Sequence, residues 1–171
     1  MRPNDLEREL ERHHRAARGW ALSCCAWDET TAQDVLQASY LKILDGRAKF
    51  AGRSSFKTWL FGVIRRTAAE HRRRKLVRRF VPLSRLDALP EGPAGEADPE
   101  TVTARSDESR RLIAALLRLP RRQRELLHLV FYQDLSISEA AAALGVSIGT
   151  ARTHYERGKR RLRELLREEN A

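Results

Sequence analysis

The chain has 171 residues, and its 33 lysines and arginines outnumber its 23 aspartates and glutamates, which gives a net charge of +10. That length suits one ordinary domain or two small helical ones, and the charge excludes most metabolic enzymes and favours a polyanionic partner, nucleic acid first. No stretch approaches about 18 consecutive apolar residues, and residues 1–28 lack the apolar core of a signal peptide, so we expect a cytoplasmic protein with no membrane insertion.

A first helix is predicted to follow Asn4 and to run to Cys25. Its apolar residues recur at helical spacing and are Leu6, Leu10, Ala17 and Trp20 or Ala21. Cys24 and Cys25 are adjacent, which is poor geometry for a mutual disulfide and typical of reduced thiols. Together with His13 and His14 they lack the usual two-residue spacing of zinc ligands, so we expect no metal.

A second helix is predicted to begin at Thr30, because Thr30 and Gln33 have the spacing of a capping box. The side chains expected to face inward are Val35, Leu36, Ser39, Ile43 and Leu44. The opposite stripe is Asp34, Gln37, Ala38 and Leu41.

A third, long helix is predicted from about Ser55, after a loop that follows Gly46. The residues expected to pack inward are Phe56, Leu60, Val63 and Ala68. Aromatic side chains alternate with basic ones through this loop and helix, a combination that suits single-stranded nucleic acid. For Phe61 we favour a place in the core, and for Trp59 both a core and a base-stacking role stay open. The basic run at residues 72–79 can equally be a solvated helix end.

Residues 82–105 are rich in proline, glycine and acidic side chains, which predicts a flexible acidic linker. The linker divides the chain into residues 1–81 and 106–171. Alternating runs typical of strands are missing, and leucine, alanine, arginine and glutamate dominate. The predicted fold class is therefore all-α, with two small helical domains joined by the linker.

The C-terminal piece contains a predicted helix-turn-helix. Ser136 and Glu139 form a capping box, Gly145 allows the chain to reverse, and Ser147 caps a second helix. Small residues at the helix crossing, Ala141 and Ala151, allow close approach. The inward residues are predicted to be Ile137, Ala140, Ala141 and Leu144, then Ile148, Ala151, Tyr155, Leu162 and Leu165. The second helix carries arginines on its other faces, which favours DNA binding over the alternative of a plain helical hairpin in a bundle.

Three segments, residues 32–44, 50–74 and 115–165, together resemble the extracytoplasmic-function (ECF) sigma factors of bacterial RNA polymerase, in the form with only the second and fourth sigma domains. The resemblance implies that the chain is not an enzyme, needs no cofactor, and binds promoter DNA and the β′ and β subunits of core RNA polymerase. The competing interpretation is a stand-alone helix-turn-helix repressor that dimerises through its N-terminal piece.

The resemblance also assigns roles to individual residues. Those that would contact the polymerase clamp are Asp34, Gln37 and Leu41. Those that would bind the −10 element or the duplex beside it are Phe50, Arg53, Ser54, Phe56, Lys57, Trp59, Arg65, Arg66, Arg72 and Arg73. Those that would bind the −35 element are Ser147, Thr150, Arg152, Thr153, Arg157 and Arg160.

The chain departs from the family's pattern in its clamp segment, where Thr31, Gln33 and Ala38 stand in place of the usual acids. A phosphate on Thr30 or Thr31 would add about −1.5 to −2 charges at a helix N-terminus and supply that missing negative field. The resemblance therefore leaves two regulators open, a Ser/Thr kinase and an anti-sigma factor.

Overall fold

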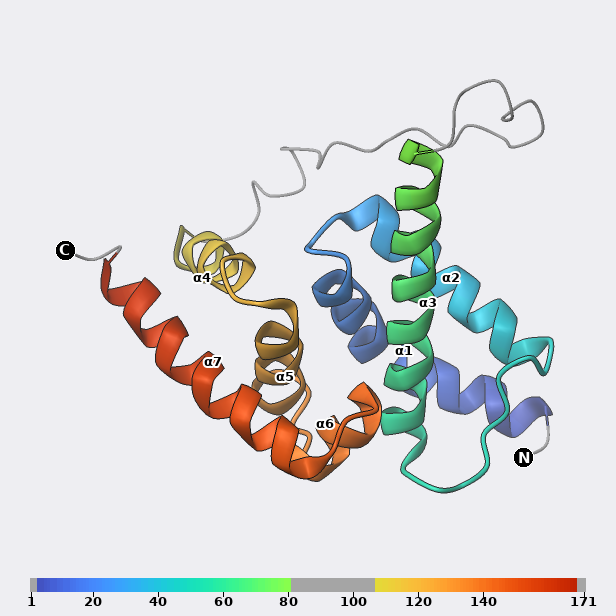
Figure 1. Ribbon diagram of the computed structural model, residues 1–171. Coiled ribbons are helices and arrows are strands. Elements are labelled where there is room, and N and C mark those ends of the chain that lie inside the picture. The colour runs from blue at the N-terminus through green and yellow to red at the C-terminus, as the bar shows by residue number, and fades with distance from the viewer. Residues whose placement is uncertain (1–2, 81–106, 169–171) are drawn as a thin grey trace.

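The structure is a computed structural model that describes residues 3–80 and 107–168. Within those residues there are seven helices and no strand, which confirms the all-α prediction. The helices are α1 (Pro3–Cys24), α2 (Glu29–Leu44), α3 (Phe56–Phe80), α4 (Asp107–Leu117), α5 (Arg121–Phe131), α6 (Ile137–Leu144) and α7 (Ile148–Glu168). Helices α1 to α3 form one half and α4 to α7 the other (Figure 1). The predicted linker, residues 82–105, lies outside the described residues.

Side-chain caps set where α2 and α3 begin. The Asp28 carboxylate accepts the backbone N–H of Thr31 at 2.9 Å, so α2 begins at Glu29. The prediction of Thr30 as the cap is wrong, because the chain turns at Ala26 and Trp27, both with positive φ, and Asp28 reaches the first free amides before Thr30 can. Helix α3 begins as predicted, with the Ser55 hydroxyl accepting the Thr58 N–H at 3.1 Å.

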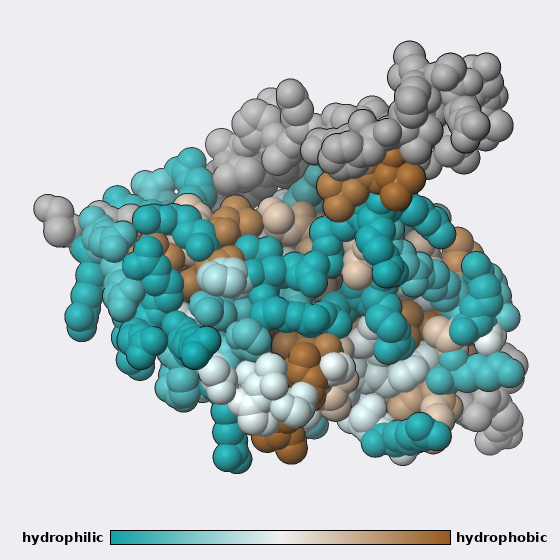
Figure 2. Space-filling model, viewed as in Figure 1, coloured by the Kyte–Doolittle hydropathy of each residue, from teal (hydrophilic) through white to brown (hydrophobic). Residues whose placement is uncertain are grey.

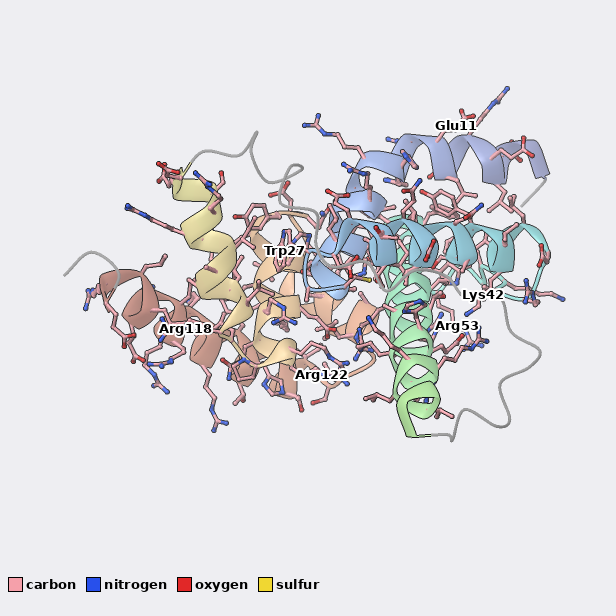
Figure 3. The ribbon with its side chains drawn as sticks, turned by 90° about the horizontal axis from the view of Figure 1, so that it is seen from above. Glu11, Trp27, Lys42, Arg53, Arg118 and Arg122 are labelled. Atoms are coloured by element: carbon pink, nitrogen blue, oxygen red, sulfur yellow. The ribbon has the colours of Figure 1, made fainter. Side chains whose placement is uncertain are left out.

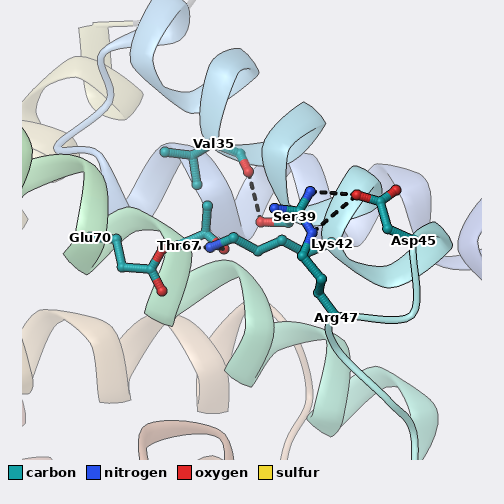
Figure 4. Close-up of polar contacts among 7 residues, drawn as sticks. All are labelled: Val35, Ser39, Lys42, Asp45, Arg47, Thr67 and Glu70. Atoms are coloured by element: carbon teal, nitrogen blue, oxygen red, sulfur yellow. Dashed lines mark hydrogen bonds and ion pairs between the residues drawn. The ribbon is translucent and has the colours of Figure 1, made fainter.

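The core of the first half lies where α1 crosses α3. Trp20 is fully buried and its indole N–H donates to the Phe61 carbonyl at 3.0 Å, while Phe61 is fully buried as favoured from the sequence. Helix α2 is tied to α3 by Lys42, whose ammonium donates to Thr67 at 3.2 Å and pairs with Glu70 at 2.5 Å (Figure 4). Because its N–H is hydrogen-bonded to α3 and its rings are fully buried, Trp20 holds α1 against α3.

The predicted inward stripe of α2 holds except at its last residue. Val35, Leu36 and Ile43 are buried, but Leu44 is 52% exposed, so that part of the prediction is wrong. The helix ends at Leu44 and the chain turns away at Gly46, which has φ +73°, so no neighbouring helix covers the final side chain.

The helix-turn-helix forms as its local signals predict. Ser136 and Glu139 make both hydrogen bonds of the capping box, and Gly145 ends α6 with φ +61°. Ser147 then accepts the Thr150 N–H at 3.1 Å. Ile148 is 49% exposed, against the prediction, because it opens α7 beyond the packed turn, and Val146 packs against the core in its place.

Helix α7 lies across α5 at a glycine that the sequence analysis did not single out. Gly158 is buried, and a Cβ at this position would lie 3.2 Å from the Cβ of Gln123 and 3.3 Å from the Leu127 side chain. A larger residue would force the two helices apart, so Gly158 sets their spacing.

The two halves share one hydrophobic core. Helix α6 packs on α3, and α5 packs on α1, so Leu126, Leu129 and Ala143 belong to the same buried cluster as Trp20 and Leu60. The sequence divides the chain into two pieces with separate apolar patterns. In the structure those pieces close on each other through α3 and α6 (Figure 1).

Candidate nucleic-acid interface

The outer stripe of α2 is free of intramolecular cover. Asp34, Gln37 and Leu41 are exposed, with Leu41 at 50%, while Val35 and Ser39 on the opposite side are buried. The three residues assigned to the polymerase clamp therefore lie together on one accessible helix face, as their spacing predicts.

Three aromatic rings cluster where the loop after α2 meets α3. The centroids of Phe50, Phe56 and Trp59 are 5.2 to 5.5 Å apart. Phe56 is buried at the base of the cluster, whereas Phe50 and Trp59 are half-buried. Phe50 and Trp59 line an open cleft of about 600 Å³ together with Lys49 and Leu44. The arrangement offers ring faces and a cation to a planar ligand.

The basic residues assigned to the −10 region fall into two groups. Arg53, Arg66 and Arg73 are exposed, and Arg53 lies on the opposite side of α3 from Arg122 of the other half (Figure 3). Ser54, also assigned to this region, is half-buried, and its hydroxyl lies 3.2 Å from the Ser55 carbonyl.

The second group of these basic side chains is engaged within the protein. Arg65 pairs with Glu125 of α5 at 3.2 Å, and Arg72 donates to the Cys24 carbonyl at 2.9 Å. Lys57 donates to the Gln133 carbonyl, which also belongs to the second half. In this arrangement the second half or the end of α1 holds these cations.

The first turns of α7 present polar groups to solvent. The Ser147 hydroxyl is fixed by Thr150, and Thr153 donates to the Gly149 carbonyl at 3.1 Å. Arg152, Arg157 and Arg160 are exposed while Ala151 is fully buried. Figure 2 shows hydrophilic side chains over most of α7. A helix with its small residue buried and its arginines outward can enter a DNA groove without rearranging.

The start of α2 carries the two threonines considered for phosphorylation. Thr30 is exposed, whereas Thr31 is half-buried beside the capping Asp28 carboxylate. Glu29 pairs with Arg18 at 2.9 Å. Asp28 and Glu29 therefore already place negative charge at this helix end.

Neither cysteine forms a disulfide, as expected from their spacing. Burial raises the pKa of Cys25 to about 12 and also raises the pKa of Cys24 well above its usual value, so both thiols stay protonated. Among residues 3–80 and 107–168 no three side chains are grouped to hold a metal ion. None of the helices over those same residues is long and apolar enough to cross a bilayer.

The most important residue that the sequence analysis missed is Glu125. It is fully buried and lies within 4 Å of three guanidinium groups, those of Arg65, Arg121 and Arg122. The available signal was a single acid directly after residues 121–124, three of which are arginines, at a position in phase with the apolar face of its helix.

Both halves of the chain match known family models. The model described as Sigma-70 region 2 matches residues 10–78, and that described as Sigma-70, region 4 matches residues 109–162. The chain is 34% identical over 146 residues to ECF RNA polymerase sigma factor SigX of Bacillus subtilis, covering 83% of this chain and 75% of that one. It is 31% identical over 134 residues to RNA polymerase sigma factor YlaC of the same organism, covering 78% and 76%.

Two solved structures have a similar fold. The sigma factor RpoE from Bartonella quintana, in complex with the anti-sigma factor NepR, matches with a TM-score of 0.72 and 27% identity, covering 95% of this chain and 97% of that one. CnrH, in complex with the cytosolic domain of CnrY, has a TM-score of 0.66 at 22% identity, covering 98% and 90%, and so shares the fold.

Proposed function

Because the chain belongs to the ECF RNA polymerase sigma factors, we propose that it binds core polymerase with α2, melts promoter DNA beside α3 and reads the −35 element with α7. It is an alternative sigma factor that directs promoter-specific transcription initiation. The proposed boundaries are residues 1–81 for the second sigma domain, 82–105 for the linker and 106–171 for the fourth. Its place of action is the cytoplasm, where polymerase works.

The observation that carries the −35 assignment is the geometry of α7. Ser147 and Thr150 fix the first turn, and Arg152 and Arg157 project outward while Ala151 anchors the helix on the core. Arginine reads guanine edges with two hydrogen bonds, so the first three turns would supply sequence preference. Arg160, three residues beyond Arg157, would contact phosphate.

The cleft between Phe50 and Trp59 supports promoter melting. Stacking a base on an aromatic ring is worth about 1–3 kcal/mol, which offsets much of the cost of unstacking it from the duplex. Lys49 at the same cleft and the exposed Arg53 would hold neighbouring phosphates. Phe56 would act from beneath, by supporting the other two rings. Opening DNA in this way forms no covalent bond and needs no cofactor, so we propose no enzymatic activity.

Core polymerase would bind the exposed stripe of Asp34, Gln37 and Leu41 through its β′ clamp, and the fourth domain would contact the β subunit. Leu41 supplies an apolar anchor half exposed to solvent. One relative of known structure, the sigma factor RpoE, is in complex with an anti-sigma factor, which makes such a factor a candidate regulator of this chain too. A Ser/Thr kinase acting on Thr30 is the other candidate.

The test is run-off transcription with purified core polymerase and a pool of promoter sequences. We expect transcripts to start from a subset that shares one −35 and one −10 sequence, and we expect none without the chain. The repressor interpretation is not favoured, since both sigma regions are present in order. Sequence-specific DNA binding with no retention of core polymerase in a pull-down would overturn our proposal.

A further inference from the structure

The start of α1 forms one wall of the aromatic cleft beside α3. Leu6 and Glu7 of α1 line the cleft together with Lys49, Phe50 and Trp59. Figure 1 shows the start of α1 next to the loop that follows α2, which carries Lys49 and Phe50. The family resemblance assigns DNA contacts to this loop and to α3 but none to α1, so the wall is an addition to the site.

Side-chain contacts hold α1 in this place. Leu10 is buried, and Leu6 packs against the same core. Farther along α1, the His13 ring stacks on the ring of Phe56, with centroids 6.0 Å apart and planes 21° apart. Glu7 lies between Leu6 and Leu10 in the sequence, so its backbone is fixed beside the cleft in the folded chain.

The cleft has one acid and one base. Among its described lining residues, only Glu7 and Lys49 carry an ionisable side chain, and the others are apolar or aromatic. The lysine ammonium donates hydrogen bonds and suits phosphate, whereas an ionised carboxylate only accepts them. Glu7 is exposed, so its carboxylate can reach a ligand in the open cleft. It is therefore the lining side chain that can accept a hydrogen bond from a base.

The four DNA bases differ in what they offer to a carboxylate. Cytosine, adenine and guanine each carry an exocyclic amino group that donates hydrogen bonds, whereas in thymine two carbonyl oxygens flank a single N–H group. The edge of the base that normally pairs with the other strand becomes available when the base leaves the duplex. Hydrogen bonds to an ionised acceptor are roughly twice as strong as those between neutral groups, so a carboxylate separates these two classes of base.

We propose that Glu7 is a specificity-determining residue of the promoter-melting cleft. Its carboxylate accepts a hydrogen bond from the exocyclic amino group of the base that stacks at Phe50 and Trp59, and it disfavours thymine there. Helix α1 thereby takes part in reading the −10 element. This inference rests on the proposed function, because it names the class of base that the proposed melting cleft accepts.

Matched variants of the full chain, bound to core polymerase, test the assignment. Glu7→Gln keeps the length of the side chain and removes its charge, and the new amide can donate to a thymine oxygen. Glu11→Gln is the control, because it makes the same change one turn along α1 at an exposed acid that does not line the cleft and that lies on the side of α1 away from α2 (Figure 3). Both positions are exposed, so both variants should fold like the unmodified chain, which circular dichroism checks.

The DNA is a pool of premelted promoters whose nontemplate strand carries random bases across the −10 element, and the DNA retained by each holoenzyme is sequenced. With the unmodified chain and with Glu11→Gln we expect thymine to be depleted about tenfold at one position. With Glu7→Gln we expect that depletion to disappear while the preferences at the other positions stay unchanged. A gain of thymine binding cannot arise from misfolding.

A second template tests the amino group itself. It carries 2-pyrimidinone, which is cytosine without its amino group, at the position where thymine is depleted. The unmodified chain should bind this template about tenfold more weakly than the cytosine template, and Glu7→Gln should distinguish the two templates much less.

Equal depletion of thymine with the unmodified chain and with Glu7→Gln would refute the role of Glu7. The absence of any thymine-depleted position, or equal binding of cytosine and 2-pyrimidinone by the unmodified chain, would refute it as well. Retention of no DNA by any of the three holoenzymes would instead refute the proposed function, and the assignment to Glu7 with it.

Discussion

Burial of His128 predicts that the protein loses stability in weak acid. Its ring lies between Trp20 and Tyr132, with centroids 5.5 and 5.3 Å away, and its Nε2 lies 3.2 Å from the Gln133 amide nitrogen. Burial lowers the pKa of His128 from 6.5 to about 4, because this setting cannot solvate a charged imidazole.

The sign and size follow from proton binding. Between pH 6.5 and about 4 the unfolded chain carries a proton on His128 that the folded chain does not. Stability therefore falls as the pH drops through this window, at ~1.4 kcal/mol per pH unit. The loss is roughly 3 kcal/mol once the pH is below the folded value, a large share of the stability of a small protein.

The assay is urea unfolding from neutral pH down to about 4. His128→Gln removes the titrating group but keeps a polar side chain beside Gln133, and His14→Gln removes an exposed histidine as the control. The His128 variant should lose most of the pH slope in this window, and the His14 variant should keep it. Equal slopes for the unmodified protein and His128→Gln would refute the burial argument.

Three other predictions concern the interfaces. Arg152→Ala should weaken binding to the cognate −35 duplex by about 1–3 kcal/mol and relax the base preference at one position. Arg160→Ala should weaken binding to all sequences alike and flatten the salt dependence of binding. A uniform loss of affinity in both variants would contradict the orientation proposed for α7. Trp59→Ala should keep −35 binding but form no permanganate-reactive bubble with polymerase, and normal bubbles would place Trp59 outside the melting site. Thr30→Glu should raise the affinity for core polymerase, measured by titration. Thr31→Glu should raise that affinity less, because the Asp28 carboxylate already occupies that helix end. Unchanged affinity in both variants would refute a phosphate switch.

Local signals in the sequence predict local structure well. The capping box at Ser136, the reversal at Gly145 and the small residues Ala141 and Ala151 each depend on neighbours within a few positions, and all appear as expected. The errors fall at helix ends. Leu44 and Ile148 continue an apolar pattern beyond the point where another helix covers it. At the start of α2 two side chains, those of Asp28 and Thr30, could cap the helix, and Asp28 does so.

The closure of the two halves has no local signal. Ala143 reads equally well as a solvated helix surface or as a contact face, and nothing near Glu125 in sequence indicates that its partner lies on α3. The exposed DNA-reading residues of α7 could be predicted because helical periodicity decides which side faces outward. The contacts of Arg65 with Glu125 and of Lys57 with Gln133 could not be predicted, because the partners are 60 or more positions away in the sequence.

The composition of α6 has a mechanical consequence. The helix lies between α3 and α7, and the side chains it buries are mainly alanines: Ala140, Ala141 and Ala143. Each lacks three carbons that a leucine would bury, and each buried carbon is worth about 0.8 kcal/mol. A contact lined by leucines would hold α6 on its neighbouring helices more strongly. The contact built from methyl groups and Gly62 buries fewer carbons, so parting it would cost less free energy than parting a contact lined by leucines.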